Sequence, residues 1–209
     1  MPFTLEMARS ALAKFDAVVE KQKTYLTDLD SAIGDADHGI NMSRGMKRVI
    51  EKTSPKEYAD FVSLFKDVAM TIMSVVGGSS GPLYGTLFMK IGQKLGTKTE
   101  VSVEELADAL EDGMKGIMTL GKSQAGDKTM IDSIRPAIEA IRANLGAGDA
   151  AALNAAVSAA EQGMADTIPM LARKGRSSYL GERSIGHQDP GATSTCYLIT
   201  SLRDAAAGS

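Results

Sequence analysis

The sequence predicts an all-α protein: an antiparallel eight-helix barrel or bundle formed by a single domain over residues 1–209. Apolar residues recur at helical spacing through almost the whole chain, and the alternation typical of half-buried strands is absent. A chain of 209 residues with 44% hydrophobic content fits one large domain, and no linker-like stretch divides it.

The eight expected helices follow one another with short connections. Their ranges, taken from the apolar stripes, are 8–19, 42–50, 61–76, 83–95, 103–117, 131–145, 153–171 and 193–202. Ser102 and Glu105 have the spacing of a capping box, while Asp189 and Pro190 supply an N-cap and a first-turn proline for the last helix. The polar and glycine-rich loops are 28–41, 77–81, 121–129 and 174–191. Because alternate connections emerge at the same end of such an array, we expect these loops to converge.

Composition excludes several classes of partner. The net charge of -3, with both signs interspersed, lacks the basic footprint of a nucleic-acid binder. The longest nearly apolar run, residues 68–76, is far shorter than the ~20 residues that span a bilayer, and no signal peptide is apparent. We therefore expect a cytoplasmic, unprocessed protein without a membrane or nucleic-acid partner. The single cysteine, Cys196, is expected to be a small core residue.

Three acids stand close together after the first expected helix. Asp30, Asp35 and Asp37 lie within eight residues of sequence, with Gly34 and Gly39 allowing the backbone to turn tightly. A hard divalent cation relieves the repulsion among three carboxylates, and oxygen ligands suit Mg2+, Ca2+ or Mn2+ better than zinc. The alternative is a solvated turn whose aspartates cap the next helix.

An EF-hand calcium loop is the sharper rival for this segment. Begun at Asp35, that loop needs a ligand at its fifth position, a glycine at its sixth and a glutamate at its twelfth. The chain has Gly39, Ile40 and Met46 there, so all three requirements fail. Since Mg2+ usually binds through a few carboxylates plus substrate phosphates, the aspartates predict a phosphorylated ligand.

The segment 77–81 forms a glycine-rich turn that opens a helix. It combines Gly77, Gly78 and Gly81 with Ser79 and Ser80. First-turn amides and the helix dipole favour a phosphate, and the serine hydroxyls can add hydrogen bonds. A bare helix connection is the alternative, although one glycine would suffice for it.

Two other patterns imitate nucleotide-binding motifs. Residues 116–123, GIMTLGKS, satisfy the letters of a P-loop, but a long amphipathic stripe rather than a strand precedes them, and Ile117, Met118 and Leu120 continue that stripe. Residues 146–151, GAGDAA, resemble a dinucleotide fingerprint without the preceding strand. We interpret both as parts of helices or helix connections.

The connection at 174–191 is the most polar long one. Arg176 and Arg183 lie among its glycines, and arginine is suited to bidentate contact with phosphate. A solvated basic loop is the alternative. His187 in this loop and His38 beside the aspartates receive no catalytic role, because such histidines can simply take part in a hydrogen bond.

Taken together, GDADHGINM, GGSSGPLYGT, GDKTM and GRSSYLGERSIGHQDPGATS resemble the nucleotide-binding subunit of bacterial dihydroxyacetone kinases, known as DhaL, and the matching C-terminal domain of ATP-dependent ones. The resemblance spans nearly the whole chain. It implies an eight-helix barrel with ADP or ATP in a shallow site at one end, the phosphates being anchored by two Mg2+ ions.

The resemblance also implies roles for individual residues. Asp30, Asp35 and Asp37 would be the metal ligands, and Arg176 would be the catalytic residue that stabilises charge as the terminal phosphoryl group leaves. The residues implied around the nucleotide are His38 and Asn41 beside the phosphates, Ser79 and Ser80 in contact with them, Gly121 and Met130 on the adenine side, Arg176 near the phosphates, and Asp189, Pro190 and Gly191 closing the pocket.

The implied activity is phosphoryl transfer to dihydroxyacetone that a separate kinase subunit holds through a histidine, so the chain would act only with that partner. Its length favours the phosphoenolpyruvate-dependent version, in which a phosphohistidine phosphocarrier protein rephosphorylates the bound ADP. We assign no general base to this chain and expect a homodimer or hetero-oligomer. The alternatives are a split ATP-dependent kinase for another small ketose or tetrose, a nucleotide or metal sensor without turnover, and a bare helical scaffold.

Overall fold

The computed structural model describes residues 2–208 and confirms the all-α class. Nine α-helices, two 3-10 helices and one pair of two-residue strands make up the regular structure of these residues. The elements are β1 (Phe3–Thr4), α1 (Leu5–Lys21), α2 (Lys23–Ile33), α3 (His38–Thr53), α4 (Phe61–Val75), α5 (Ser80–Leu95), β2 (Glu100–Val101), α6 (Val103–Gly121), α7 (Ile131–Asn144), η1 (Leu145–Ala147), α8 (Asp149–Asp166), η2 (Arg176–Ser184) and α9 (Pro190–Ala206).

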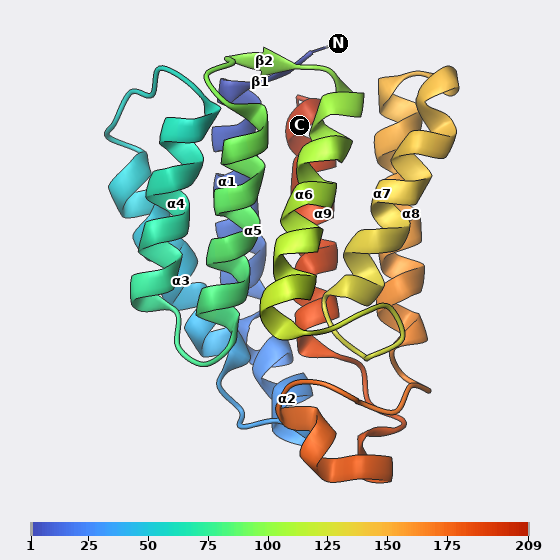
Figure 1. Ribbon diagram of the computed structural model, residues 1–209. Helices are drawn as coiled ribbons and strands as arrows, with labels where there is room; N and C mark the ends of the chain where they lie inside the picture. The colour runs from blue at the N-terminus through green and yellow to red at the C-terminus, as the bar shows by residue number, and fades with distance from the viewer. Residues whose placement is uncertain (1, 209) are drawn as a thin grey trace.

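Eight helices form a closed barrel, as the sequence predicts. Starting at α3, each helix packs on the next as far as α9, α9 packs on α1, and α1 returns to α3 (Figure 1). Neighbouring helices run in opposite directions (Figure 1). The short antiparallel pair β1–β2 lies at the end drawn uppermost, where Phe3 is opposite Val101.

The ninth helix, α2, was not predicted. It lies below the barrel in Figure 1 and contacts α3, α9 and η2. The predicted loop 28–41 is therefore wrong: α2 continues to Ile33 and α3 already begins at His38. The apolar stripe of α2 is too sparse to identify from the sequence, because only Leu26, Asp30 and Ile33 are buried on it.

The predicted loop 174–191 also contains regular structure. Residues Arg176–Ser184 form η2, and α9 begins at Pro190. Asp189 caps α9 as expected, since its side chain accepts a hydrogen bond from the amide of Ala192 at 2.7 Å. The capping box of Ser102 and Glu105 is present at the start of α6.

An aromatic cluster forms part of the barrel core. Ring centroids of Phe15 and Tyr84 are 6.2 Å apart, those of Tyr84 and Phe88 6.4 Å, and those of Phe88 and Phe65 6.0 Å. Such packing gives the barrel a rigid interior. Cys196 is buried among core residues, as expected. None of the helices in residues 2–208 combines the length and apolarity required to cross a membrane.

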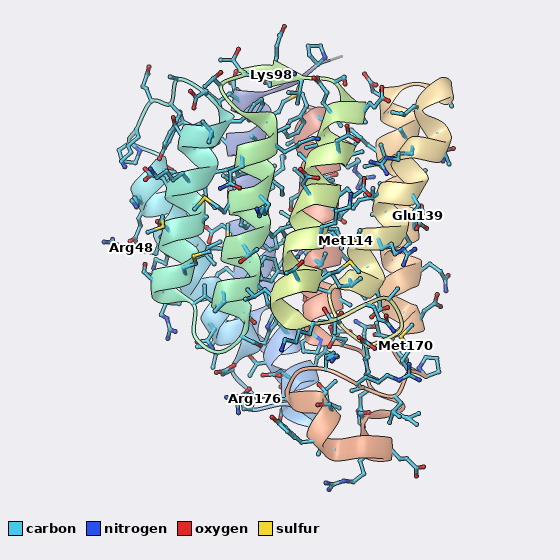
Figure 2. The ribbon with its side chains drawn as sticks, viewed as in Figure 1. Arg48, Lys98, Met114, Glu139, Met170 and Arg176 are labelled. Atoms are coloured by element: carbon cyan, nitrogen blue, oxygen red, sulfur yellow. The ribbon has the colours of Figure 1, made fainter. Side chains whose placement is uncertain are left out.

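The connections that carry the polar motifs gather at one end. The segments between α2 and α3, α4 and α5, α6 and α7, and α8 and α9 all lie at the lower end of Figure 1, as the alternation of helix direction predicts. In Figure 2, Arg176 lies at this end and Lys98 at the opposite one. Four separate parts of the chain therefore contribute to one surface.

The interpretation of residues 116–123 as helix is confirmed. Helix α6 continues through Gly121, and Lys122 ends it in the left-handed conformation at φ 49°. Residues 146–151 likewise cover the end of η1 and the start of α8. Neither segment follows a strand, so neither has the context of a nucleotide-binding motif.

Candidate functional site

A pocket lies where the four connections meet. It encloses about 740 Å3 of empty space, the open mouth included. Its lining residues are Asp30, Asp35, Asp37, His38, Gly78, Ser79, Ser80, Leu83, Tyr84, Lys128, Thr129, Met130, Lys174, Gly175, Arg176, Ser177, Asp189, Pro190 and Gly191.

The three predicted aspartates stand together on one side of this pocket. One carboxylate oxygen from each of Asp30, Asp35 and Asp37 lies within 4.8 Å of the others. The Asp30 Oδ2 atom accepts the backbone amides of Asp37 and His38 at 2.8 and 3.1 Å, which folds the segment around that side chain. Asp37 is the N-cap residue of α3, but its side chain makes no capping hydrogen bond. Capping of α3 therefore accounts for Asp30, which accepts the amide of its first residue, but not for the side chain of Asp37.

Two glycines permit this arrangement by close approach rather than by a left-handed backbone. A Cβ atom on Gly34 would stand 2.0 Å from Asp30 Oδ1, and one on Gly39 would stand 2.1 Å from the carbonyl oxygen of Lys23. Neither glycine has a positive φ. Both contacts are impossible for any larger residue, so the aspartate cluster depends on these two positions.

The chemistry of the cluster fits a divalent cation. Its donors are all oxygens, which hard cations such as Mg2+ prefer, and three carboxylates at this separation repel one another without a counter-charge. Arg176 supplies one positive charge, because its Nε lies 3.0 Å from Asp35 Oδ2. That ion pair is largely exposed, with the two side chains 62% and 32% accessible, and so contributes little stability. The pocket therefore retains carboxylates to hold a metal.

His38 takes part in a buried hydrogen-bond network. Its Nδ1 lies 3.0 Å from Ser80 Oγ and its Nε2 lies 2.9 Å from Ser194 Oγ. Tyr84 extends the network with its hydroxyl 2.7 Å from the same Ser194 oxygen. Burial lowers the pKa of His38, although the nearby aspartates oppose this shift. Both ring nitrogens are engaged by serine hydroxyl groups, so His38 is placed to orient Ser80.

The start of α5 presents hydrogen-bond donors to the pocket. Ser79 is the N-cap residue of α5, and its side chain makes no capping hydrogen bond. Gly78 before it has a φ of 63°, which glycine adopts without strain. The first amides of α5 and the Ser79 hydroxyl therefore remain available for an anion.

Two of the predicted residues lie behind the pocket instead of lining it. Asn41 is buried on α3, where its Oδ1 accepts from Arg44 at 2.8 Å and its amide lies against Gly77. Gly121 is the last residue of α6, and a Cβ atom there would stand 3.6 Å from Leu83, which does line the pocket. These positions can influence the site only through their neighbours.

Asp189, Pro190, Gly191 and Met130 form another wall of the pocket. Asp189 is buried, and burial raises its pKa to about 7, with the hydrogen bond from Ala192 opposing the shift. Its amide donates to Thr167 Oγ1 at 3.0 Å. Since Asp189 caps α9 and stands over the end of α8, its carboxyl group fixes this wall.

Several lining residues were given no individual role from the sequence, although Gly78 and Lys174 lie in segments that were expected to contact phosphate. They are Gly78, Leu83, Tyr84, Lys128, Thr129, Lys174, Gly175 and Ser177. Lys128 and Thr129 belong to the GDKTM motif, in which only Met130 was assigned a role. His187, in contrast, is exposed and does not line the pocket.

Lys122 tests the rejected P-loop. Because it lies outside the pocket at the left-handed end of α6, we expect Lys122→Ala to change Mg2+-dependent ADP affinity by less than about twofold. In a genuine P-loop the lysine contacts the phosphates directly. A loss of affinity by orders of magnitude in a folded variant, measured by calorimetry, would restore the motif.

The fold and the pocket together define a helical-barrel protein with an acidic, metal-compatible site at one end. Residues 32–204 match the model of the DAK2 domain, and the chain therefore belongs to the Dak2 family.

Similar proteins cover nearly the whole chain. It is 45% identical over 197 residues to the PEP-dependent dihydroxyacetone kinase, ADP-binding subunit DhaL, of Escherichia coli (strain K12), covering 93% of this chain and 94% of that protein. It is 37% identical over 204 residues to the PTS-dependent dihydroxyacetone kinase, ADP-binding subunit DhaL, of Lactococcus lactis subsp. lactis (strain IL1403), covering 98% and 99%. The crystal structure of the dihydroxyacetone kinase from C. freundii in complex with AMP-PNP and Mg2+ has the same fold. It superposes with a TM-score of 0.74 at 24% identity, covering 98% of this chain and 34% of that one.

Proposed function

We propose that this chain is the ADP-binding subunit of a dihydroxyacetone kinase. The observation that carries the proposal is the meeting of three carboxylates, the free N-terminus of α5 and Arg176 in one pocket. Similarity over nearly the full length of two DhaL subunits supports the same conclusion. The chain works as a single domain in the cytoplasm, and its active form is a hetero-oligomer with the kinase subunit that binds the sugar.

The metal ligands are Asp30, Asp35 and Asp37. Two Mg2+ ions bound by these side chains would neutralise negative charge on the phosphates of the nucleotide. The buried Asp30 is fixed by two amides, whereas Asp35 is reached by Arg176. Asp35 is thus the ligand that links the metal site to the last loop.

The remaining pocket residues position the nucleotide. Ser79, Ser80 and the first amides of α5 bind phosphate, while His38 keeps Ser80 oriented. Met130 forms the adenine side, Gly121 supports it from behind through Leu83, Asn41 supports the glycine turn, and Asp189, Pro190 and Gly191 close the pocket. Arg176 stabilises charge on the transferred phosphoryl group, which is the largest contribution a protein makes to such a transfer.

The acceptor hydroxyl group is activated on the partner subunit. In this chain both nitrogens of His38 are engaged by serine hydroxyl groups, so this side chain is not placed to remove a proton. The phosphoryl group comes from phosphoenolpyruvate through a phosphohistidine carrier protein, as the names of the similar subunits suggest.

A thermal melt tests the nucleotide site. One ligand that joins four separate connections stabilises the folded state by RT ln(1 + [L]/Kd), or about 4 kcal/mol at a thousandfold excess over Kd. For a domain of this size that corresponds to a rise in Tm of about 10 °C. Nucleotide-stripped protein should show this rise with ADP and Mg2+ together, and chelation of Mg2+ should remove it because the carboxylates then face phosphates of like charge. The absence of both a shift and any adenine nucleotide in the denatured protein would favour the bare scaffold.

Reconstitution distinguishes the kinase subunit from its alternatives. Transfer to dihydroxyacetone with phosphoenolpyruvate and the carrier protein supports the proposal, whereas transfer only with ATP, or only to another ketose or a tetrose, identifies a split kinase of that kind. Binding to a partner without turnover identifies a regulatory subunit.

A further inference from the structure

The segment between α8 and α9 is a long loop whose two ends meet. Where they meet, the amide of Gly186 donates to the carbonyl oxygen of Ile168 at 2.8 Å. The loop, residues 168–186, brings Arg176 and Ser177 to the wall of the pocket. The position of Arg176 therefore depends on the contacts that hold the two ends of this loop, here called its neck, together.

Lys128 enters this neck from the connection between α6 and α7. Its side chain is 1% exposed, and its Nζ lies 3.4 Å from the carbonyl oxygen of Ile168, 3.1 Å from that of Met170 and 2.6 Å from that of Ser184. An ammonium group has three N–H donors, so all of them are used on the loop. Although Lys128 lines the pocket, it has no donor left for a phosphate.

The surroundings of Lys128 fix it in this position. Its φ of 63° is uncommon for a residue other than glycine. The carbonyl oxygen of its neighbour Asp127 accepts the amide of Arg173 at 3.1 Å, which adds a second link to the same loop. Burial lowers the pKa of Lys128 and the carboxyl group of Asp189 opposes that shift. A left-handed backbone and a buried cation persist together only where surrounding contacts determine both.

We infer that Lys128 is a positioning residue that binds both ends of loop 168–186 and thereby sets the place of Arg176 over the aspartate cluster. The effect on phosphoryl transfer rests on the proposed function, whereas the anchoring of the loop does not. Replacing Lys128 leaves the carbonyl groups of Met170 and Ser184 without their donor. The loop then opens at its neck while the barrel remains closed.

Hydrogen exchange of the full chain tests the anchoring. Lys128→Met keeps an unbranched stem without donors, and Lys128→Gln keeps two donors and provides a second variant in case the first does not fold. We expect exchange of amides in 168–186 to accelerate by about tenfold or more in Lys128→Met, and less in Lys128→Gln, with the amides of α1 and α5 unchanged. Lys122→Met is the matched control, since Lys122 is also left-handed, is exposed and has its side chain outside the pocket.

A double-mutant cycle on turnover tests the link to Arg176. In the reconstituted kinase, Lys128→Gln should lower kcat by roughly tenfold in the native background and by less than about twofold when Arg176 is already alanine. A residue with a merely structural role would give equal losses in both backgrounds.

The outcomes separate the two proposals. Unchanged exchange in 168–186, or acceleration spread evenly over the chain, overturns the positioning role even if ADP binds normally. Equal losses in the cycle overturn it as well. A native chain that fails to bind ADP contradicts the proposed function, while localised acceleration in Lys128→Met still supports the anchoring.

Discussion

Asp35→Asn is expected to abolish the Mg2+-dependent binding of ADP. The substitution keeps the shape of the side chain and removes one of three charges whose oxygens lie within 4.8 Å of one another. Loss of an outer hydrogen-bond partner alone typically costs roughly 10–100-fold in metal affinity, so loss of a ligand charge should cost more than about a hundredfold. Calorimetric titration of nucleotide-stripped protein with ADP, at fixed Mg2+, measures the change.

Folding should be preserved in this variant. The ion pair between Asp35 and Arg176 is exposed, and pairs of this kind contribute only about 0–1 kcal/mol to stability. Asp28→Asn is the matched control, because Asp28 is an exposed aspartate on α2, the helix before Asp35, and does not line the pocket. It should bind ADP as the native chain does. An unchanged ADP affinity in Asp35→Asn would show that the cluster is not the metal site.

The barrel and the convergence of its loops were predictable because both follow from local patterns. Apolar stripes at helical spacing identify the eight barrel helices, and alternation of direction places four connections at one end. Helix α2 could not be predicted in this way because it has few buried apolar positions of its own. Its stability comes from packing on α3 and η2. The sequence places its buried Asp30 in a loop, although Asp30 lies in the last turn of the helix.

The site was predictable only in part, for a different reason. Acidic, glycine-rich and serine-rich segments can be recognised from their composition. The contacts of Lys128, in contrast, are with residues 40, 42 and 56 positions away in the sequence. The spacing of residue types along the sequence does not indicate contacts over such separations. Asn41 and Gly121 were predicted to lie in the site but do not line the pocket. Family motifs include residues that support a pocket from behind as well as residues that line it, and the sequence alone does not separate the two kinds.

Arg176→Ala is expected to lower turnover of the reconstituted kinase by about a thousandfold or more, the range found where a single arginine stabilises charge in phosphoryl transfer. Arg176 reaches the aspartate cluster from η2, with its Nε 3.0 Å from Asp35 Oδ2, and so stands where nucleotide phosphates would meet the metal. Since the metal ligands remain, the affinity for ADP with Mg2+ should change by less than about tenfold.

Arg176→Lys keeps the charge but loses the planar pair of donors, and should recover only part of the rate. Arg183→Ala is the matched control, because Arg183 is an exposed arginine of η2 beyond the kink at Gly181 and does not line the pocket, and it should retain native turnover. Steady-state rates at saturating partner subunit and calorimetric ADP affinities measure these effects. If turnover of Arg176→Ala stays within about tenfold of the native rate, Arg176 takes no part in the chemical step and is only a surface ion-pair partner of Asp35.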